Sequence, residues 1–241
     1  MQLLPTHPPA PAEELDLLAR WLPLGGARVL ELGCGDGERT RRIAARFAPR
    51  ELVAAEVDPA AHARNQARAA GDGPTADPIR YATFGAEAIE AGDGAFDAVL
   101  LFKSLHHVPG AALDRALAEI ARVLRPGGSV WISEPVARGA FDQLLRRFHD
   151  ERAVRAAAFA AVQRAVDAGL LVLEREHFFA SHRHFPDFQA FADAVIHVTH
   201  TEHRLDAATL AAVRADFEAH AGPAGAHFVT PNRVDLLRRP G

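Results

Sequence analysis

A glycine-rich turn between an apolar segment and an amphipathic segment is the part of the sequence best suited to bind a ligand. Gly33, Gly35 and Gly37 alternate within VLELGCGDGERT at positions 29–40, and glycine lets a ligand approach the backbone closely. The apolar residues before the glycines are typical of a buried strand, while apolar residues at helical spacing over 38–47 indicate a helix whose N-terminus faces the ligand. Strand, glycine turn and helix together predict the nucleotide crevice of an open α/β sheet.

The spacing of these glycines separates the turn from two other nucleotide-binding classes. A dinucleotide fingerprint reads Gly-x-Gly-x-x-Gly, whereas this turn reads Gly-x-Gly-x-Gly, with Glu31 two residues before the first glycine. An acidic side chain at the strand end favours an ammonium group over a pyrophosphate. The sequence also lacks the Gly-x-x-x-x-Gly-Lys-Ser/Thr pattern of P-loop nucleotidases. These features argue against NAD and against nucleoside triphosphates.

Four ordered motifs resemble those of the class I S-adenosylmethionine-dependent methyltransferases. The glycine turn, with Glu31 before it, resembles motif I of that family. The other three are LVAAEVDP at 52–59, FDAVLLFKSLHHVP at 96–109 and RVLRPGGSVWISE at 122–134. Four motifs in order are more specific than one glycine turn. The resemblance extends from about Val29 to Glu134 and implies a Rossmann-like open α/β sheet of about seven mostly parallel strands, with helices on both faces. It also implies S-adenosylmethionine as cofactor and S-adenosylhomocysteine as product.

The resemblance implies a place for each part of the cofactor. Glu31 and the glycine turn would hold its amino acid end, and Glu56 would accept hydrogen bonds from its ribose hydroxyls. Many members carry Gly-Asp-Ala after the third strand, whereas this chain has FGAEA at 84–88. The adenine contact therefore falls to the Glu87 side chain or to the backbone of Ala86 and Glu87. The expected cofactor residues are Glu31, Gly33, Cys34, Gly35, Gly37, Glu56, Val57, Ala86, Glu87 and Phe102.

Three residues after the fourth predicted strand are candidates for catalysis. Lys103 is the only lysine among 27 basic side chains, and it falls where the methyl group would lie. Its amine could bind an acidic group of the acceptor or lower the pKa of a phenol, or it could simply reach solvent. His106 and His107 match the family's Leu-His-His motif, and we favour His107 as the base that removes the acceptor's proton. Methyl transfer mainly needs alignment of the reactants, so some members of the family use no base.

Hydrophobic patterning predicts the elements that position these residues. Strands are expected near 28–32, 51–56, 79–83, 96–102 and 129–133, with a sixth over Leu170–Phe179 and a seventh over Ala226–Leu237. A helix over Pro11–Leu22 would cover the cofactor, and Asp58 would cap a helix beginning at Pro59. One or two helices over Arg138–Ala168 would wall the acceptor site, because ligands bind at the carboxyl ends of the strands.

The C-terminal third contains two groups with open interpretations. Phe185, Phe188 and Phe191 are either helix core, which we favour, or the lining for an aromatic acceptor. The histidines at 197, 200 and 203 are either a polar surface or a metal site, and spacing alone favours the surface. No metal ligands are therefore predicted. The segment Gly71–Pro78 is expected to be a flexible connection.

Composition and charge narrow the classes of protein. The 241 residues are 49% hydrophobic, which can supply a sizeable core, and a single cysteine, Cys34, excludes an internal disulfide and is expected to be a small buried filler. No apolar run of spanning length and no signal-peptide pattern is present, so a cytoplasmic location is expected. A net charge of -4 argues against a nucleic-acid partner. The arginines at 39, 41, 42, 46 and 50 are expected on a solvated helix face.

The sequence thus predicts one methyltransferase domain over 1–241. A helical cover would occupy 1–27, the cofactor core 28–134, and the acceptor-side helices with the last two strands 135–241. The expected activity is methyl transfer from S-adenosylmethionine to an oxygen, nitrogen or carbon atom of a small molecule, by a monomer or a homodimer with no membrane partner. Two alternatives stay open: a methyltransferase acting on RNA or protein, and a protein that binds S-adenosylmethionine without transfer.

Overall fold

The computed structural model describes residues 1–71, 78–197 and 205–241. The strands are β1 (Arg28–Leu32), β2 (Glu51–Ala55), β3 (Ile79–Ala82), β4 (Phe96–Phe102), β5 (Leu124–Pro135), β6 (Val172–Phe185), β7 (Ala221–Gly222) and β8 (Gly225–Arg238). The helices are α1 (Glu14–Trp21), α2 (Glu38–Phe47), α3 (Pro59–Gly71), α4 (Leu113–Val123), α5 (Ala140–Leu145), α6 (Arg152–Asp167), α7 (Phe188–Phe191) and α8 (Ala207–Glu218), with the short turns η1 (Leu105–His107), η2 (Gly110–Ala112) and η3 (Ala192–Ile196).

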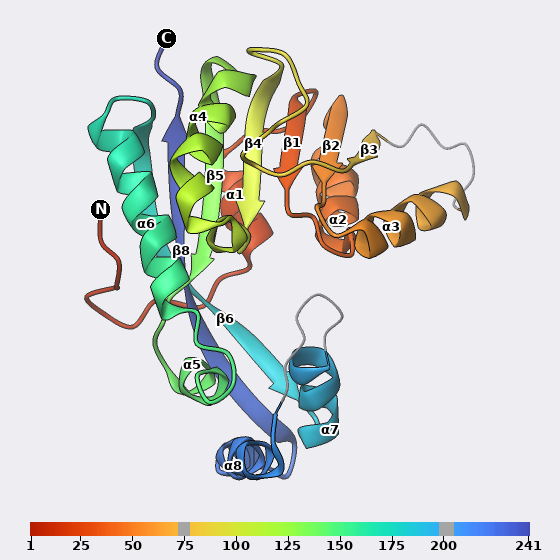
Figure 1. The fold of residues 1–241 in the computed structure, drawn as a ribbon, viewed down its shortest axis with the longest axis vertical. Coiled ribbons are helices and arrows are strands. Elements are labelled where there is room, and N and C mark those ends of the chain that lie inside the picture. Colours follow the sequence, from red (N-terminus) through yellow and green to blue (C-terminus); the bar gives the residue numbers. More distant parts are fainter. Residues whose placement is uncertain (72–77, 198–204) are drawn as a thin grey trace.

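One sheet organises the molecule in the order β3-β2-β1-β4-β5-β8-β6, with β7 paired to β8 (Figure 1). Strands β1 to β5 pair in parallel, whereas β8 is antiparallel to both β5 and β6. The chain builds outward from β1 to β3 on one side and from β4 to β5 on the other, so the strand order reverses between β1 and β4. Open α/β sheets bind their ligands outside the carboxyl ends of the strands at such a point. The predicted α/β fold is confirmed.

Alternating residues of the central strands feed two apolar cores. Val29, Leu100 and Trp131 face the core shared with α1 and α2, while Leu30 and Ile132 face the core shared with α4 and α6. Figure 1 shows α4 and α6 in front of the sheet and α1 behind it. Strands buried on both faces need such continuous apolar runs, which is why the strand predictions for this region succeed.

A third apolar core lies beyond the carboxyl ends of β4 and β5, where β6 and β8 extend past the other strands to meet α5, α7 and α8 (Figure 1). We call this part, built from α5, α7, α8 and the adjoining ends of β6 and β8, the cap. Phe185, Phe188 and Phe191 are all buried in its core together with Phe217 and Phe228, as the favoured interpretation predicts. The cap places a wall of protein on the side of the sheet where ligands bind.

Several boundaries differ from those predicted. Strand β6 runs to Phe185 rather than ending at 179, because β8 pairs with it along its whole length, from Val172 opposite Arg238 to Phe185 opposite Ala226. Strand β5 begins at Leu124, and the predicted Pro-Gly-Gly turn is a register irregularity inside it. Residues 72–77 of the predicted connection, and two of the three histidines at 197, 200 and 203, lie outside the described residues.

Two further predictions concern helices. The Asp58 carboxylate accepts hydrogen bonds from the backbone N–H groups of Ala60 at 2.9 Å and Ala61 at 3.3 Å, so it caps α3 as predicted. Among the described residues, no helix combines the length and the apolar character needed to cross a bilayer.

Candidate active site

The glycine turn between β1 and α2 joins the ends of three strands. The N–H groups of Gly33 and Cys34 both donate to the Ala55 carbonyl at the end of β2, at 2.9 and 3.1 Å. After β4, the Ser104 hydroxyl donates to the Leu32 carbonyl at 2.8 Å. Gly33, Gly35 and Gly37 all adopt positive φ, at 74°, 57° and 69°, a conformation that side chains with a Cβ disfavour. The turn therefore has a backbone path that requires glycine, held from both neighbouring strands.

Glu56 directs its carboxylate into this turn. One oxygen, Oε2, accepts the Gly35 N–H at 2.8 Å, and the other, Oε1, accepts the Asp58 N–H at 2.9 Å. Val57 beside it is 65% exposed. Glu56, which follows β2, thus lies against the glycine turn, and a half-buried carboxylate at this place can accept hydrogen bonds from the hydroxyl groups of a ligand.

Glu31 lies beneath the turn, not on its surface. Glu31 is only 2% exposed, and the Thr40 hydroxyl of α2 donates a hydrogen bond to its Oε2 at 2.6 Å. Burial raises the pKa of this carboxyl from 4.5 to about 7, against a smaller lowering by the Thr40 hydrogen bond. Glu31 therefore connects β1 to α2, a contact that the sequence does not reveal because Thr40 carries no motif.

Asn65 of α3 is a further part of the turn that sequence reasoning missed. Its amide donates to the Gly35 carbonyl at 2.8 Å and lies 3.8 Å from the Cys34 sulfur. Cys34 is buried, and burial raises the pKa of its thiol well above the usual range. The thiol is therefore neutral, in agreement with a buried filler and not a nucleophile.

The segment expected to contact adenine follows β3. Ala86 is buried and Glu87 is half-buried. A Cβ placed on Gly85 would collide with the Glu87 carboxylate, so this carboxylate folds back over its own loop. Phe102, also expected at the cofactor, is buried, and the Arg39 guanidinium lies 4.6 Å from its ring centroid. The structure therefore makes Phe102 a platform for an arginine of α2.

Arg42, Arg46 and Arg50 are exposed, as the sequence predicts, and three arginines of α2 also form ion pairs. They pair with acidic residues of the N-terminal helix segment. These pairs are Arg39–Glu14 at 3.0 Å, Arg42–Glu13 at 2.9 Å and Arg46–Asp16 at 2.6 Å. These ion pairs form because α1 packs beside α2 and the acidic side chains of the N-terminal segment reach the arginines. The pairs help to hold α1 over this side of the sheet.

Lys103 takes part in the same contact. Its Nζ lies 3.0 Å from Glu14 Oε2, and Glu14 is 5% exposed. Burial lowers the pKa of the Lys103 amine although Glu14 opposes this effect, and the nearby cations Lys103 and Arg39 hold the Glu14 pKa below its ordinary value in spite of burial. Lys103 also adopts a positive φ of 57°. None of the interpretations drawn from the sequence anticipated that the Lys103 amine binds Glu14 of α1.

Replacing Lys103 by Met should reduce the free energy of unfolding by about 1 to 3 kcal/mol, because a charged hydrogen bond to buried Glu14 is lost. Urea unfolding of Lys103→Met, Glu14→Gln and the double variant would measure it. The double variant should lose clearly less than the sum of the single losses, since both single changes break the same contact. Strictly additive losses would show that the pair contributes nothing to stability.

His106 is held between two carboxylates. It is 4% exposed, its Nδ1 bonds to Glu134 Oε2, and its Nε2 lies 3.6 Å from Glu151 Oε1. Burial lowers its pKa, but Glu134 and Glu151 outweigh burial and raise the value to about 9. His106 is therefore protonated at neutral pH, which makes it unsuitable as the base. His107 is exposed and stacks near His106, with ring centroids 4.1 Å apart.

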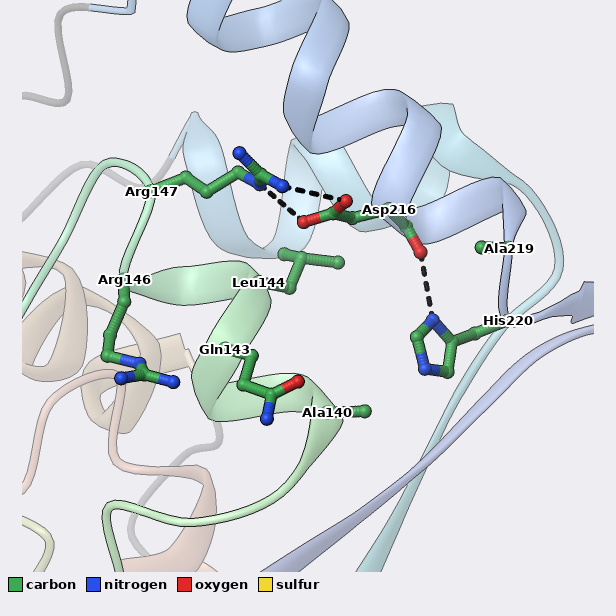
Figure 2. A pocket seen from close by; sticks show the side chains of 8 residues that line it. All are labelled: Ala140, Gln143, Leu144, Arg146, Arg147, Asp216, Ala219 and His220. Atoms are coloured by element: carbon green, nitrogen blue, oxygen red, sulfur yellow. Dashed lines mark hydrogen bonds and ion pairs between the residues drawn. The ribbon is translucent and has the colours of Figure 1, made fainter.

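A separate hollow of about 450 Å³ lies between α5 and α8 of the cap. Figure 2 shows it lined by Gln143 and Leu144 on one side and by the Arg147–Asp216 ion pair and His220 on the other. It is lined by none of the residues expected at the cofactor, so it is distinct from the expected cofactor site at the glycine turn.

Comparisons with known proteins agree with the geometry of the turn. A family profile described as a methyltransferase domain matches residues 29–128. An uncharacterized methyltransferase of Mycobacterium tuberculosis is 40% identical over 125 residues, which cover 52% of this chain and 44% of that relative. The chain thus matches less than half the length of this curated relative.

Two solved structures show the same fold at low sequence identity. The cyclase SpnF aligns with a TM-score of 0.62 at 24% identity, covering 93% of this chain and 79% of the other. Phosphoethanolamine N-methyltransferase 2 of Haemonchus contortus, solved in complex with S-adenosyl-L-methionine, aligns with a TM-score of 0.58 at 16% identity, covering 96% and 54%. The structural neighbours show the fold alone, whereas the profile match identifies residues 29–128 as a methyltransferase domain, which with the glycine turn and Glu56 supports a class I S-adenosylmethionine-dependent methyltransferase.

Proposed function

We propose that the protein transfers the methyl group of S-adenosylmethionine to an oxygen, nitrogen or carbon atom of a small molecule. The observation that carries this proposal is the Glu56 carboxylate at the glycine turn, bonded to the Gly35 N–H at 2.8 Å. A diol that approaches the turn meets this acceptor, while the glycines leave room for the rest of the ligand. The bound cofactor would supply an activated methyl group on a sulfonium.

The residues of the chain would then bind and orient. Glu56 would hold the ribose, the turn would hold the amino acid end, and the backbone near Ala86 with Glu87 would face the adenine. Buried Glu31 would act indirectly, by holding α2 against β1 through Thr40. Accurate alignment of acceptor and methyl group accounts for most of the rate that such a site needs.

A small-molecule acceptor is supported by the cap. Its core of buried phenylalanines lies beyond the carboxyl ends of β4 and β5, on the side of the sheet where open α/β folds bind their ligands (Figure 1). A wall of protein on that side suits a small acceptor better than an extended RNA or protein.

Calorimetric titration with S-adenosylmethionine, S-adenosylhomocysteine and NAD tests the cofactor. We expect micromolar binding of the first two and none of NAD. A screen of small hydroxylated and aminated acceptors with methyl-labelled cofactor then tests transfer. Tight cofactor binding without transfer to any small acceptor, RNA or protein would favour a binding protein instead, an alternative kept open because the cyclase SpnF shares this fold.

Replacing Glu56 by Ala should weaken S-adenosylmethionine binding by about 1.5 to 3 kcal/mol, because its carboxylate would accept hydrogen bonds from the ribose. Calorimetry on the purified variant measures the change. Glu90→Ala, a substitution of an exposed acid in the loop after β3, is the matched control and should bind the cofactor like the unchanged protein. Equal affinity of a folded Glu56→Ala protein would remove Glu56 from the site.

A further inference from the structure

The structure brings together three potential metal ligands that the sequence places 45 residues apart at their widest. His106 and His107 belong to η1, and Glu151 precedes α6. One nitrogen of each histidine and one oxygen of the carboxylate all lie within 4.8 Å of one another. The sequence predicted no metal ligands, because only tertiary packing of α6 against η1 brings Glu151 to the two histidines.

The separation of His106 and Glu151 fits a shared metal better than a hydrogen bond. Their Nε2 and Oε1 atoms lie 3.6 Å apart. Two ligand atoms that each bind a tetrahedral zinc ion at about 2.1 Å lie about 3.4 Å from one another. The His107 ring is tilted by 43° against that of His106, and one of its nitrogens lies within 4.8 Å of a His106 nitrogen and a Glu151 oxygen.

The surroundings of the cluster orient its ligands. Glu134 binds Nδ1 of His106 and so directs the opposite nitrogen, Nε2, toward Glu151. A carboxylate behind a metal-binding histidine is the usual supporting arrangement. Arg155 and His149 in turn contact the Glu151 carboxylate, which fixes its position. The donor set and its support are therefore both present. Without metal His106 is protonated at neutral pH, so a bound ion would replace the Nε2 proton and release it to solvent.

We propose that His106, His107 and Glu151 bind one divalent transition-metal ion of the Zn²⁺ type. Two imidazoles and one carboxylate suit such ions, whereas Mg²⁺ and Ca²⁺ prefer oxygen ligands alone. His106 is buried and His107 is exposed, so the ion has protein on one side and solvent on the other. Three protein ligands leave one position of a tetrahedral ion for water or for an oxygen of a small molecule.

Titration of untagged, chelator-treated protein with Zn²⁺ alone tests the proposal by calorimetry, and Co²⁺ absorption reports the coordination. We expect one Zn²⁺ per chain with micromolar or tighter affinity and no comparable binding of Mg²⁺. His107→Ala and Glu151→Gln should each weaken Zn²⁺ binding at least tenfold. Exposed His107 can be replaced without opening the core, which keeps the test valid if a change at His106 prevents folding.

His220→Ala provides the matched control, because this histidine lies at the cap hollow of Figure 2, whose lining includes none of the three proposed ligands. Its Zn²⁺ affinity should equal that of the unchanged protein. The proposal is wrong if no Zn²⁺ binds, or if binding survives both His107→Ala and Glu151→Gln. Loss of binding in His197→Ala instead would place the ion at the C-terminal histidines and would also overturn it. Because the readout is metal binding alone, the result does not depend on methyl transfer.

Discussion

Replacing Gly33 by Ala should destabilise the protein by about 2 to 5 kcal/mol, because two costs combine at this position. Its φ of +74° is disfavoured for any residue with a Cβ, and the added atom would lie 2.6 Å from the Ser104 Cβ. The left-handed backbone accounts for about 1 to 2 kcal/mol, and overpacking a rigid contact adds about 1 to 3 kcal/mol. Chemical denaturation measures the loss in free energy of unfolding.

Gly35→Ala separates the two costs. This glycine also has a positive φ, but an added Cβ would meet nothing within 4 Å. The loss should therefore be limited to about 1 to 2 kcal/mol from the backbone alone. Adding Ser104→Gly to Gly33→Ala removes the colliding side chain and should recover part of the larger loss. If the Gly33→Ala and Gly35→Ala variants have equal free energies of unfolding, the contact between Gly33 and Ser104 is not rigid.

Ionisation of Glu31 should destabilise the folded protein by about 3 kcal/mol as the pH rises. Burial raises the pKa of this carboxyl from 4.5 to about 7, and each pKa unit corresponds to about 1.4 kcal/mol. The folded state thus binds more protons than the unfolded state between these values. The contribution of Glu31 is fully present below pH 4.5 and is lost as the pH rises through about 7.

The Glu31→Gln variant tests the direction of this pH dependence of stability. The amide oxygen of the variant can still accept the Thr40 hydroxyl, which now bonds to Glu31 Oε2 at 2.6 Å, but it has no charge to desolvate. The variant should match the unchanged protein near pH 4.5 and be more stable by about 3 kcal/mol above pH 8. The difference between the two unfolding free energies, measured at each pH, cancels the other titrating groups. A difference that stays constant with pH would contradict the raised pKa.

Local sequence patterns were sufficient to predict the strands and the glycine turn of the segment from Val29 to Glu134. The apolar run before Gly33, the glycine spacing and the position of Glu56 at the end of β2 are all features of short segments. They predict strands, a glycine turn and a carboxylate at one edge of the sheet. The structure has each of these, including the Gly35–Glu56 hydrogen bond that joins two of the motifs.

The roles of the charged residues after β4 could not be predicted in this way. Lys103 bonds to Glu14, 89 positions earlier in the chain, and His106 lies between Glu134 and Glu151. No motif records such pairs, because each partner comes from a helix or strand end that only the packing of the sheet brings near.

The sequence by itself determined the α/β sheet, the glycine turn and the carboxylate beside that turn, since these depend on periodicity and glycine spacing within continuous segments. Tertiary structure alone decided that Lys103 binds α1, that His106 lies between two carboxylates and that Glu151 lies near both histidines. The physical reason is that the charge state and orientation of a side chain depend on burial and on nearby charges. Those are properties of the packed molecule, and residues distant in sequence supply them.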